Sequence, residues 1–248
     1  MSFNFSLLKK PFVGPGVLGS SICMDKVYTK IVLENAGIPQ VKSIVCTRGN
    51  EEKMIPEIEE KLGYPCFVKP SNSGSSVGCF KVSNRAELEK SLKEAARFDR
   101  KVLVEEFIDC KEVECAVLGN ANPYASTPGE IVSESEFYDY DDKYINGTSY
   151  TRIPADIPEE DRETIRKLAI KAFKACDLAG LSRIDFFREK KTGKIYLNEI
   201  NTIPGFTSIS MYGKMLAHDG IDYKSLITKL LELAEENFEA NKREDARN

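Results

Sequence analysis

The sequence contains no tryptophan, only one histidine and no long apolar or basic run. A membrane-spanning helix needs roughly 20 consecutive apolar residues, so we expect no contact with a membrane. The 35 Lys and Arg residues are interspersed with 39 Asp and Glu residues, which gives a formal net charge of -4. Nucleic-acid binding requires clustered positive charge to neutralise phosphates, so we expect no nucleic-acid partner. These features favour a protein of the cytoplasm.

The cysteines and the single histidine exclude two common kinds of catalytic site. The seven cysteines form no CxxC pair and are scattered through apolar segments, which is typical of reduced core residues. His218 is the only histidine, so a Ser-His or Cys-His pair has a single candidate base, and it lies in a polar stretch. We therefore expect no thiol catalysis and a surface position for His218.

The 248 residues, 42% of them hydrophobic, are enough for one large domain or two smaller ones. Apolar spacing predicts helices over residues 21–36, 51–62, 85–98, 158–176 and 223–238. Apolar runs predict strands over residues 41–46, 66–69, 79–82, 102–107, 113–118, 183–188 and 194–201. The stretch 126–154 has little periodicity and is expected to be a functional loop. This order predicts an α+β protein with two lobes and largely antiparallel sheets.

Residues 14–19 match the GxGxxG pattern of dinucleotide-binding proteins, but their context differs. The strand before the pattern would be only a few residues long. The acidic residue at the expected distance, Glu34, falls inside a predicted helix instead of at the end of a second strand. The pattern is therefore interpreted as a glycine-rich turn that leads into a helix.

The segment Ser71 to Gly78 is a second glycine-rich loop, and it is a better candidate for phosphate binding. Its glycines allow the backbone to approach a ligand, while N–H and hydroxyl groups can converge on phosphate oxygens. Lys69 lies directly before the loop and could add a positive charge. Loops of this composition also occur without a ligand, so a plain hairpin loop is the alternative.

The strongest pattern joins Asp185 with Glu199 and Asn201 across a predicted hairpin. Alternation along a strand places Glu199 and Asn201 on one face, and pairing brings Asp185 close to them. Three oxygen ligands on one patch suit Mg²⁺, which is typically bound by carboxylates together with substrate phosphates. A polar sheet face is the alternative. We favour the metal, because carboxylates within apolar runs are costly to bury without a partner.

Several segments together resemble D-alanine-D-alanine ligases of the ATP-grasp superfamily. They are GPGVLGSSICMDK (14–26), FVKPSNSGSSVG (67–78), VEEFIDCKEVECAVLG (104–119), EFYDYDDKY (136–144), IPADIP (153–158), RIDFF (183–187) and NEINTIPGFTSISMY (198–212). The resemblance covers residues 11–235 and implies an ATP-grasp fold whose two lobes clamp the nucleotide. It implies a small lobe over 22–106 and a C-terminal lobe with the metal site over 107–240. Residues 1–21 would then end an N-terminal domain, and 241–248 would form a tail.

The resemblance also implies roles for individual residues. Lys26 and Lys69 would contact nucleotide phosphates, with Ser75 and Ser76 in the loop that closes over them. The adenine would lie against Glu105, Glu106, Phe107 and Ile108, and the ribose against Glu112, while Lys143 and Tyr144 would belong to a mobile loop. Asp185, Glu199 and Asn201 would bind two Mg²⁺ ions, which Mn²⁺ can replace. Arg183 and the Gly205 N–H would hold the oxyanion, and Ser210 and Met211 would contact the second amino acid.

The implied reaction is the ATP-dependent joining of two D-alanines for peptidoglycan precursors. ATP would phosphorylate the first carboxylate, and the amine of the second D-alanine would attack the acyl phosphate. A tyrosine at position 144 favours an amine over a hydroxy-acid acceptor. The family's usual N-terminal domain is expected to be largely absent from this sequence, so either a partner chain supplies it or it was removed from a longer protein; a homodimer is also a candidate assembly. A weakly active ATP-binding subunit and a ligase for another amino acid pair stay open as alternatives.

Overall fold

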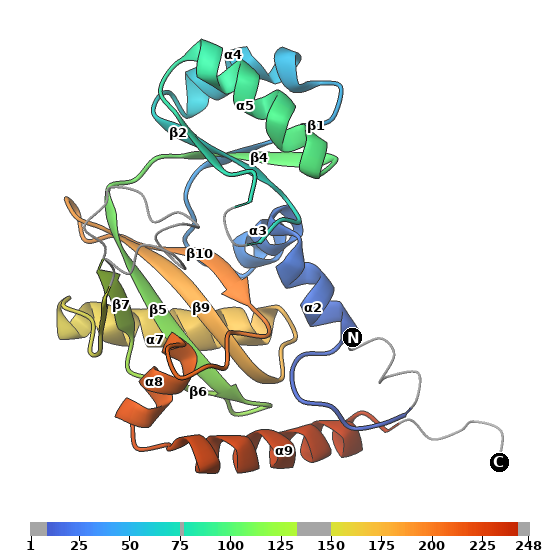
Figure 1. Cartoon of the computed structure of the whole chain (residues 1–248), viewed down its shortest axis with the longest axis vertical. Coiled ribbons are helices and arrows are strands. Elements are labelled where there is room, and N and C mark those ends of the chain that lie inside the picture. Colours follow the sequence, from blue (N-terminus) through green and yellow to red (C-terminus); the bar gives the residue numbers. More distant parts are fainter. Residues whose placement is uncertain (1–8, 75–76, 133–149, 243–248) are drawn as a thin grey trace.

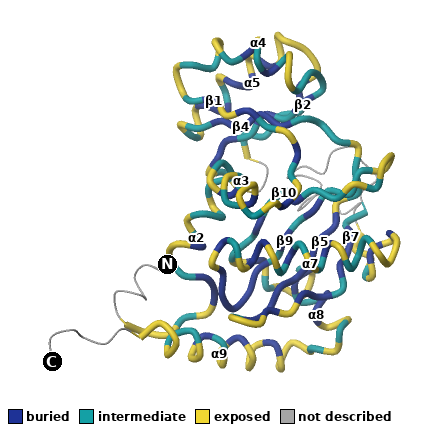
Figure 2. The backbone as a smooth tube through the Cα atoms, turned by 180° about the vertical axis from the view of Figure 1, so that it is seen from behind, coloured by how far each residue is buried: buried dark blue, intermediate teal, exposed yellow. Residues whose placement is uncertain are grey.

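The computed structural model describes residues 9–74, 77–132 and 150–242. Two β-sheets lie one above the other, and every strand pairing within these residues is antiparallel (Figure 1). Most helices lie on the outer side of a sheet and one lies between the two sheets, while buried residues run along the strands (Figure 2). The predicted α+β class with two antiparallel lobes is therefore confirmed.

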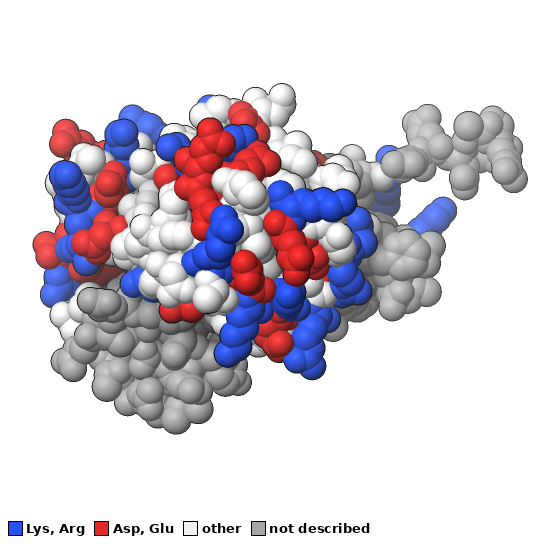
Figure 3. Space-filling view, turned by 90° about the horizontal axis from the view of Figure 1, so that it is seen from above, with Lys and Arg blue, Asp and Glu red and all other residues white. Residues whose placement is uncertain are grey.

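The upper sheet and its two helices form the small lobe. Its strand order is β1 (Ser43–Thr47), β4 (Lys101–Glu106), β2 (Cys66–Pro70) and β3 (Phe80–Val82). Helices α4 (Glu51–Lys61) and α5 (Arg85–Phe98) cover one face. Asn84 caps α5 by accepting a hydrogen bond from the Glu87 N–H, so this helix begins where the sequence predicts. Seen from above, acidic and basic side chains intermix over this lobe (Figure 3).

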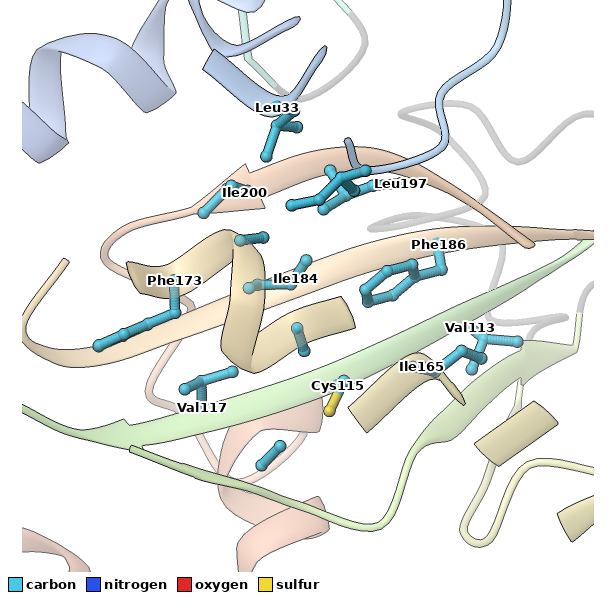
Figure 4. Close-up of a cluster of buried hydrophobic side chains, with 14 of the residues drawn as sticks. Leu33, Val113, Cys115, Val117, Ile165, Phe173, Ile184, Phe186, Leu197 and Ile200 are labelled. Atoms are coloured by element: carbon cyan, nitrogen blue, oxygen red, sulfur yellow. The ribbon is translucent and has the colours of Figure 1, made fainter. Parts of the chain in front are cut away.

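The lower sheet forms the large lobe. It contains β10 (Ile195–Asn201), β9 (Gly180–Glu189), β5 (Cys110–Gly119), β7 (Gly129–Val132) and β8 (Tyr150–Arg152), with β6 (Tyr124–Ala125) paired to β5. Helix α7 (Glu159–Ala175) covers one face with Ile165 and Phe173, which pack on Ile184 and Phe186 (Figure 4). Helices α8 (Met211–His218) and α9 (Tyr223–Ala240) cover the other face. Strand β5 is buried along most of its length because both faces are covered.

One predicted helix is wrong in its extent. Residues 21–36 were expected to form a single helix, but α2 (Val17–Met24) ends before Asp25 and α3 (Lys26–Asn35) begins after it. The backbone of Asp25 is extended, and its carboxylate accepts hydrogen bonds from the N–H groups of Val27 and Tyr28. Asp25 is therefore an N-cap, which the apolar spacing on both sides of it concealed.

Four elements were not predicted. Strands β7 and β8 lie within the region interpreted as a loop and β6 directly before it, while α8 falls in a segment for which no element was predicted. The three strands are at most four residues long, too short to show a periodic pattern. The bounds of the two lobes stay a prediction. Leu33 and Ile38 pack with the core of the large lobe, although they were assigned to the small one.

The chain passes between the lobes at residues 36–42 and again after β4, and these two links lie side by side. The Glu106 N–H donates to the Lys42 carbonyl, and the Glu106 carboxylate accepts from the Lys42 N–H. The Leu197 N–H on β10 donates to the Pro39 carbonyl at 2.9 Å, so the first link also covers the edge of the lower sheet. No helix within the described residues is long and apolar enough to span a membrane.

Candidate nucleotide and metal site

A small cleft lies where α3, the upper sheet and β10 meet. Its lining comprises Cys23, Lys26, Thr29, Lys30, Lys69, Glu105, Asn198, Glu199 and Ile200. Four of the sequence-predicted site residues, Lys26, Lys69, Glu105 and Glu199, are therefore brought together from different elements. A larger and more open cavity of about 580 Å³ lies on the outside of the small lobe beside the start of α4. None of the predicted site residues lines it, so the cleft is the better candidate.

Three charged residues form the upper wall of the cleft, and we call them the lysine cluster: the half-buried Lys30 and Lys69 and the buried Glu105. Glu105 is buried on β4, with Lys69 Nζ 2.6 Å from Oε2 and Lys30 Nζ 2.7 Å from Oε1. Each carboxylate oxygen thus has its own lysine. Two cations and one anion leave the cluster with a net positive charge, which suits phosphate oxygens.

Glu105 and Lys69 keep their charges although they lie in a buried setting. Burial by itself would raise the pKa of Glu105, but Lys69 and Lys30 outweigh burial and lower this pKa to about 2. Burial also opposes the charge of Lys69, yet the neighbouring carboxylate raises the pKa of this lysine above its ordinary value. Both charges are therefore kept at neutral pH.

Lys26 connects helix α3 to the glycine-rich loop. Its Nζ donates to the Ser73 carbonyl at 2.5 Å, and its N–H donates to the Ser71 carbonyl at 3.0 Å. The Asp25 carboxylate accepts from the Ser71 hydroxyl and forms an ion pair with Lys101. The base of the loop is thereby fixed beside the cleft. Ser75 and Ser76, predicted to close over phosphates, lie outside the described residues.

The lower wall carries the residues predicted to bind metal, together with Arg183 and Glu114; we call these five residues the carboxylate cluster. In the β9–β10 hairpin Glu199 lies opposite Asp185, and Asn201 lies opposite Arg183. Arg183 donates to both oxygens of Asp185 at 2.7 Å, and Asn201 Nδ2 donates to Asp185 Oδ2 at 3.0 Å. Glu114, buried on β5, lies 3.2 Å from Arg183. The predicted juxtaposition of Asp185, Glu199 and Asn201 is confirmed.

The guanidinium of Arg183 is held among these carboxylates. Burial opposes its charge, but Asp185 and Glu114 raise its pKa above the ordinary value. Arg183 is therefore a fixed cation in a wall that is otherwise acidic. Such a group can stabilise negative charge that develops on a reacting carbonyl.

The side chains of the carboxylate cluster suit a Mg²⁺ ion that is shared with a bound phosphate. They do not suit a metal ion that is bound by protein side chains alone. Within the described residues, no group of three His, Cys, Asp or Glu side chains is placed to hold an ion. Two carboxylates and an amide oxygen are instead the partial set that Mg²⁺ uses when substrate phosphates complete its coordination. To bind such an ion, Asp185 would have to give up its two hydrogen bonds with Arg183.

The residues predicted to receive adenine and ribose continue from β4 into β5. The Glu106 side chain is engaged with Lys42 at the crossing between the lobes. The ring of Phe107 lies 6.1 Å from that of Phe67, with Lys81 Nζ 4.4 Å from its centroid. Ile108 is half-buried and Glu112 is exposed, so the arrangement leaves an apolar surface next to an accessible carboxylate.

Gly205 and Ser210 are brought into contact by the turn before α8. A Cβ atom at Gly205 would lie 2.8 Å from the Ser210 hydroxyl oxygen, so only glycine fits here without a shift. The Ser210 hydroxyl accepts from the Thr207 N–H at 3.0 Å, and Met211 is buried beside it. Lys143 and Tyr144 lie outside the described residues. His218 is exposed at the end of α8, as expected for a surface histidine.

Two charged residues of the walls were not singled out in the sequence. Lys30 lies one helical turn after Lys26, and residues four apart share a helix face, so this spacing was an available signal. Glu114 lies two residues after Glu112 on one strand, which puts both on one sheet face. Both spacings are common among exposed residues, so neither indicates that Lys30 or Glu114 is removed from solvent.

Two antiparallel lobes with a charged cleft between them are the arrangement expected of the ATP-grasp class of fold. The chain matches the family model described as "D-ala D-ala ligase C-terminus" over residues 32–232, and it belongs to this family. It is 56% identical to a D-alanine--D-alanine ligase of Acetivibrio thermocellus over 97% of this chain and 65% of that protein. The chain thus spans about two thirds of the length of the curated relatives it matches.

Solved structures agree with the family assignment. A D-alanine-D-alanine ligase from Coxiella burnetii is similar with a TM-score of 0.85 and 38% identity, over 96% of this chain and 64% of that one. The VanG D-Ala:D-Ser ligase from Enterococcus faecalis is similar with a TM-score of 0.85 and 39% identity, over 94% of this chain and 68% of that one. The suspected resemblance is confirmed.

Proposed function

We propose that this chain forms the ATP- and Mg²⁺-binding part of a ligase that joins two D-alanine molecules through an acyl phosphate. The observation that carries the proposal is that one cleft is lined both by the positively charged lysine cluster and by Glu199 of the carboxylate cluster. A nucleotide triphosphate with its metal requires this combination, because phosphates seek cations while the metal seeks carboxylates. Peptidoglycan precursor synthesis in the cytoplasm is the corresponding role.

Each wall would have a separate task. Lys26 and Lys69 bind the phosphates, and the apolar surface at Phe107 and Ile108 receives the adenine, with Glu112 at the ribose. Asp185, Glu199 and Asn201 hold Mg²⁺, which neutralises charge during phosphoryl transfer when it is bound. Arg183 and the Gly205 N–H stabilise the oxyanion that forms when the amine attacks the acyl phosphate. Ser210 and Met211 position the second amino acid.

The loop residues outside the described ranges complete this proposal. They are Ser75 and Ser76, proposed to contact the phosphates, and Lys143 and Tyr144, proposed to act at the reacting groups. Exclusion of water protects an acyl phosphate from hydrolysis. The chain spans about two thirds of the length of its curated relatives, so the proposal for this chain is centred on the ATP and Mg²⁺ site.

A second candidate function is a ligase that uses D-serine in the second position. The similarity to the VanG D-Ala:D-Ser ligase supports it, because that protein matches this chain with the same TM-score as the ligase from Coxiella burnetii. Both acceptors carry an attacking amine, so the proposed chemistry is the same. An ATP-binding subunit with weak activity is a third outcome of the experiment below.

The test is ADP release by the purified chain with ATP and Mg²⁺, alone, with D-alanine, and with D-alanine plus D-serine. Glu199→Ala removes a proposed metal ligand, and we expect it to abolish amino-acid-dependent release. Glu163→Ala changes an exposed carboxylate on α7 and is the matched control. D-Alanine-dependent turnover in the control but not in Glu199→Ala supports the ligase. Mg²⁺-dependent ATP binding without turnover supports the subunit, and equal Mg-ATP affinity in all three proteins contradicts the metal site.

A further inference from the structure

Lys30 lies at the junction of the two lobes and is held at both its backbone and its side chain. Its carbonyl accepts from Gln40 Nε2 at 3.0 Å, and its Nζ contacts the Val41 carbonyl at 3.4 Å. The same Nζ lies 2.7 Å from Glu105, and the side chain is 14% exposed. Helix α3 thus presents Lys30 to the upper sheet from between the two sheets (Figure 1).

The lysine cluster contains one more cation than it needs to neutralise Glu105. The Glu105 side chain is 4% exposed, and each of its oxygens contacts a different lysine. A phosphate that drew Lys69 away would leave a buried carboxylate uncompensated if no second cation were present. Removing one partner of a buried pair is strongly unfavourable. With Lys30 in place, Glu105 stays paired.

We propose that Lys30 is a positioning residue of the nucleotide site, which holds the charge of Glu105 so that Lys69 can leave this carboxylate and bind phosphate. This inference rests on the proposed ATP site. It assigns Lys30 an indirect role, because its ammonium stays on Glu105 while that of Lys69 moves. Lys30 also lines the cleft, so direct contact with phosphate is the competing explanation.

The test compares dissociation constants for ATP and adenosine, measured by calorimetry in the presence of Mg²⁺. Lys30→Met removes the second cation, so Lys69 stays on Glu105. We expect ATP binding to weaken by about 10- to 100-fold, the usual range for one lost charge-assisted hydrogen bond. Adenosine has no phosphates, and its affinity should not change. Lys30→Arg keeps the charge and should restore most of the ATP affinity.

A double-mutant cycle separates the indirect role from direct contact. In a Glu105→Gln background there is no carboxylate to hold Lys69, so adding Lys30→Met should leave the ratio of ATP to adenosine affinity unchanged. This double variant has no buried carboxylate left without a cation, so it serves as the test if Lys30→Met alone does not fold. Arg188→Met removes a similarly buried cation that pairs with Asp161 beside α7, and it should not alter this ratio.

Three results would overturn the inference. They are wild-type ATP affinity in Lys30→Met, an equal loss for ATP and adenosine, and a loss of ATP affinity that persists in the Glu105→Gln background. The last result would assign Lys30 to the phosphates directly. Failure of the unaltered protein to bind ATP would instead reject the proposed function, and the positioning role of Lys30 would be rejected with it.

Discussion

The two walls of the cleft are built on the same plan with opposite charge. In the small lobe one carboxylate, Glu105, lies between two lysines; in the large lobe one guanidinium, Arg183, lies between Asp185 and Glu114. The first arrangement leaves an extra cation and the second an extra anion. In each wall the central ion, Glu105 or Arg183, pairs with two side chains of opposite charge, which we call the outer ions. A central ion can therefore keep one partner while the other binds a ligand.

The central ion of each wall should matter more to stability than the outer ions. Glu105→Ala leaves two lysines facing each other without a counterion, and we expect a loss of about 3–5 kcal/mol in the free energy of unfolding. Urea unfolding followed by circular dichroism measures this loss. Glu163→Ala on the surface of α7 is the control and should cost little. A loss below about 1 kcal/mol for Glu105→Ala, as for an exposed pair, would show that the lysine cluster is solvated.

Acid should weaken the upper wall within a defined pH range. The folded pKa of Glu105 is about 2, below its ordinary value of 4.5. A lowered folded pKa contributes stability above the unfolded pKa, and this stability is lost as pH falls from 4.5 towards about 2. The difference corresponds to about 3 kcal/mol. The measurement is the free energy of unfolding as a function of pH in the wild type and in Glu105→Gln. The variant has no carboxyl group to titrate at this position, so only the wild type should lose this stability. Parallel curves for the two proteins would contradict the prediction.

An outer ion of the lower wall should have a smaller effect. Glu114→Gln keeps the shape of the side chain, and Arg183 retains both hydrogen bonds to Asp185. We expect a loss of about 1 kcal/mol in urea unfolding. Glu163→Gln, in an exposed pair with Arg166, is the matched control. A loss as large as that of Glu105→Ala would mean that Glu114, instead of Asp185, is the main partner of Arg183.

Thiol labelling of the native protein compares the stability of the two lobes directly. Cys46 in the small lobe and Cys115 in the large lobe are both fully buried, and burial raises the pKa of each to about 12. Helices α7, α8 and α9 cover both faces of the six-stranded lower sheet, whereas α4 and α5 cover one face of the four-stranded upper sheet and α3 contacts only part of the other, at β4. The small lobe should therefore open more easily. We expect Cys46 to react faster by about tenfold, a modest difference in opening free energy. Mass spectrometry of time points measures both rates, and faster labelling of Cys115 would reverse the comparison.

Long periodic elements were predictable from the sequence, and short or capped ones were not. Helix α5 begins and ends as predicted because its apolar spacing and its Asn84 cap agree. The break at Asp25 was missed because apolar spacing continues on both sides of it. The hairpin that places Glu199 opposite Asp185 was predictable from its two apolar strands and the polar turn between them. Lys30 was missed because its importance comes from burial against Glu105, a residue 75 positions away, and sequence spacing carries no information on such a contact.

The ladder between β9 and β10 contains an irregularity with a further consequence. Its register shifts between Leu197 and Glu199, so Asn198 and Glu199 together face Asp185. If Asn198 were deleted, Glu199 would directly follow Leu197 and would still lie opposite Asp185. Asn198 therefore lines the cleft, but it is the extra residue in the ladder and does not determine which residues of β9 and β10 pair. A substitution at position 198 can therefore change the lining of the cleft while Leu197 stays opposite Phe186 and Glu199 stays opposite Asp185.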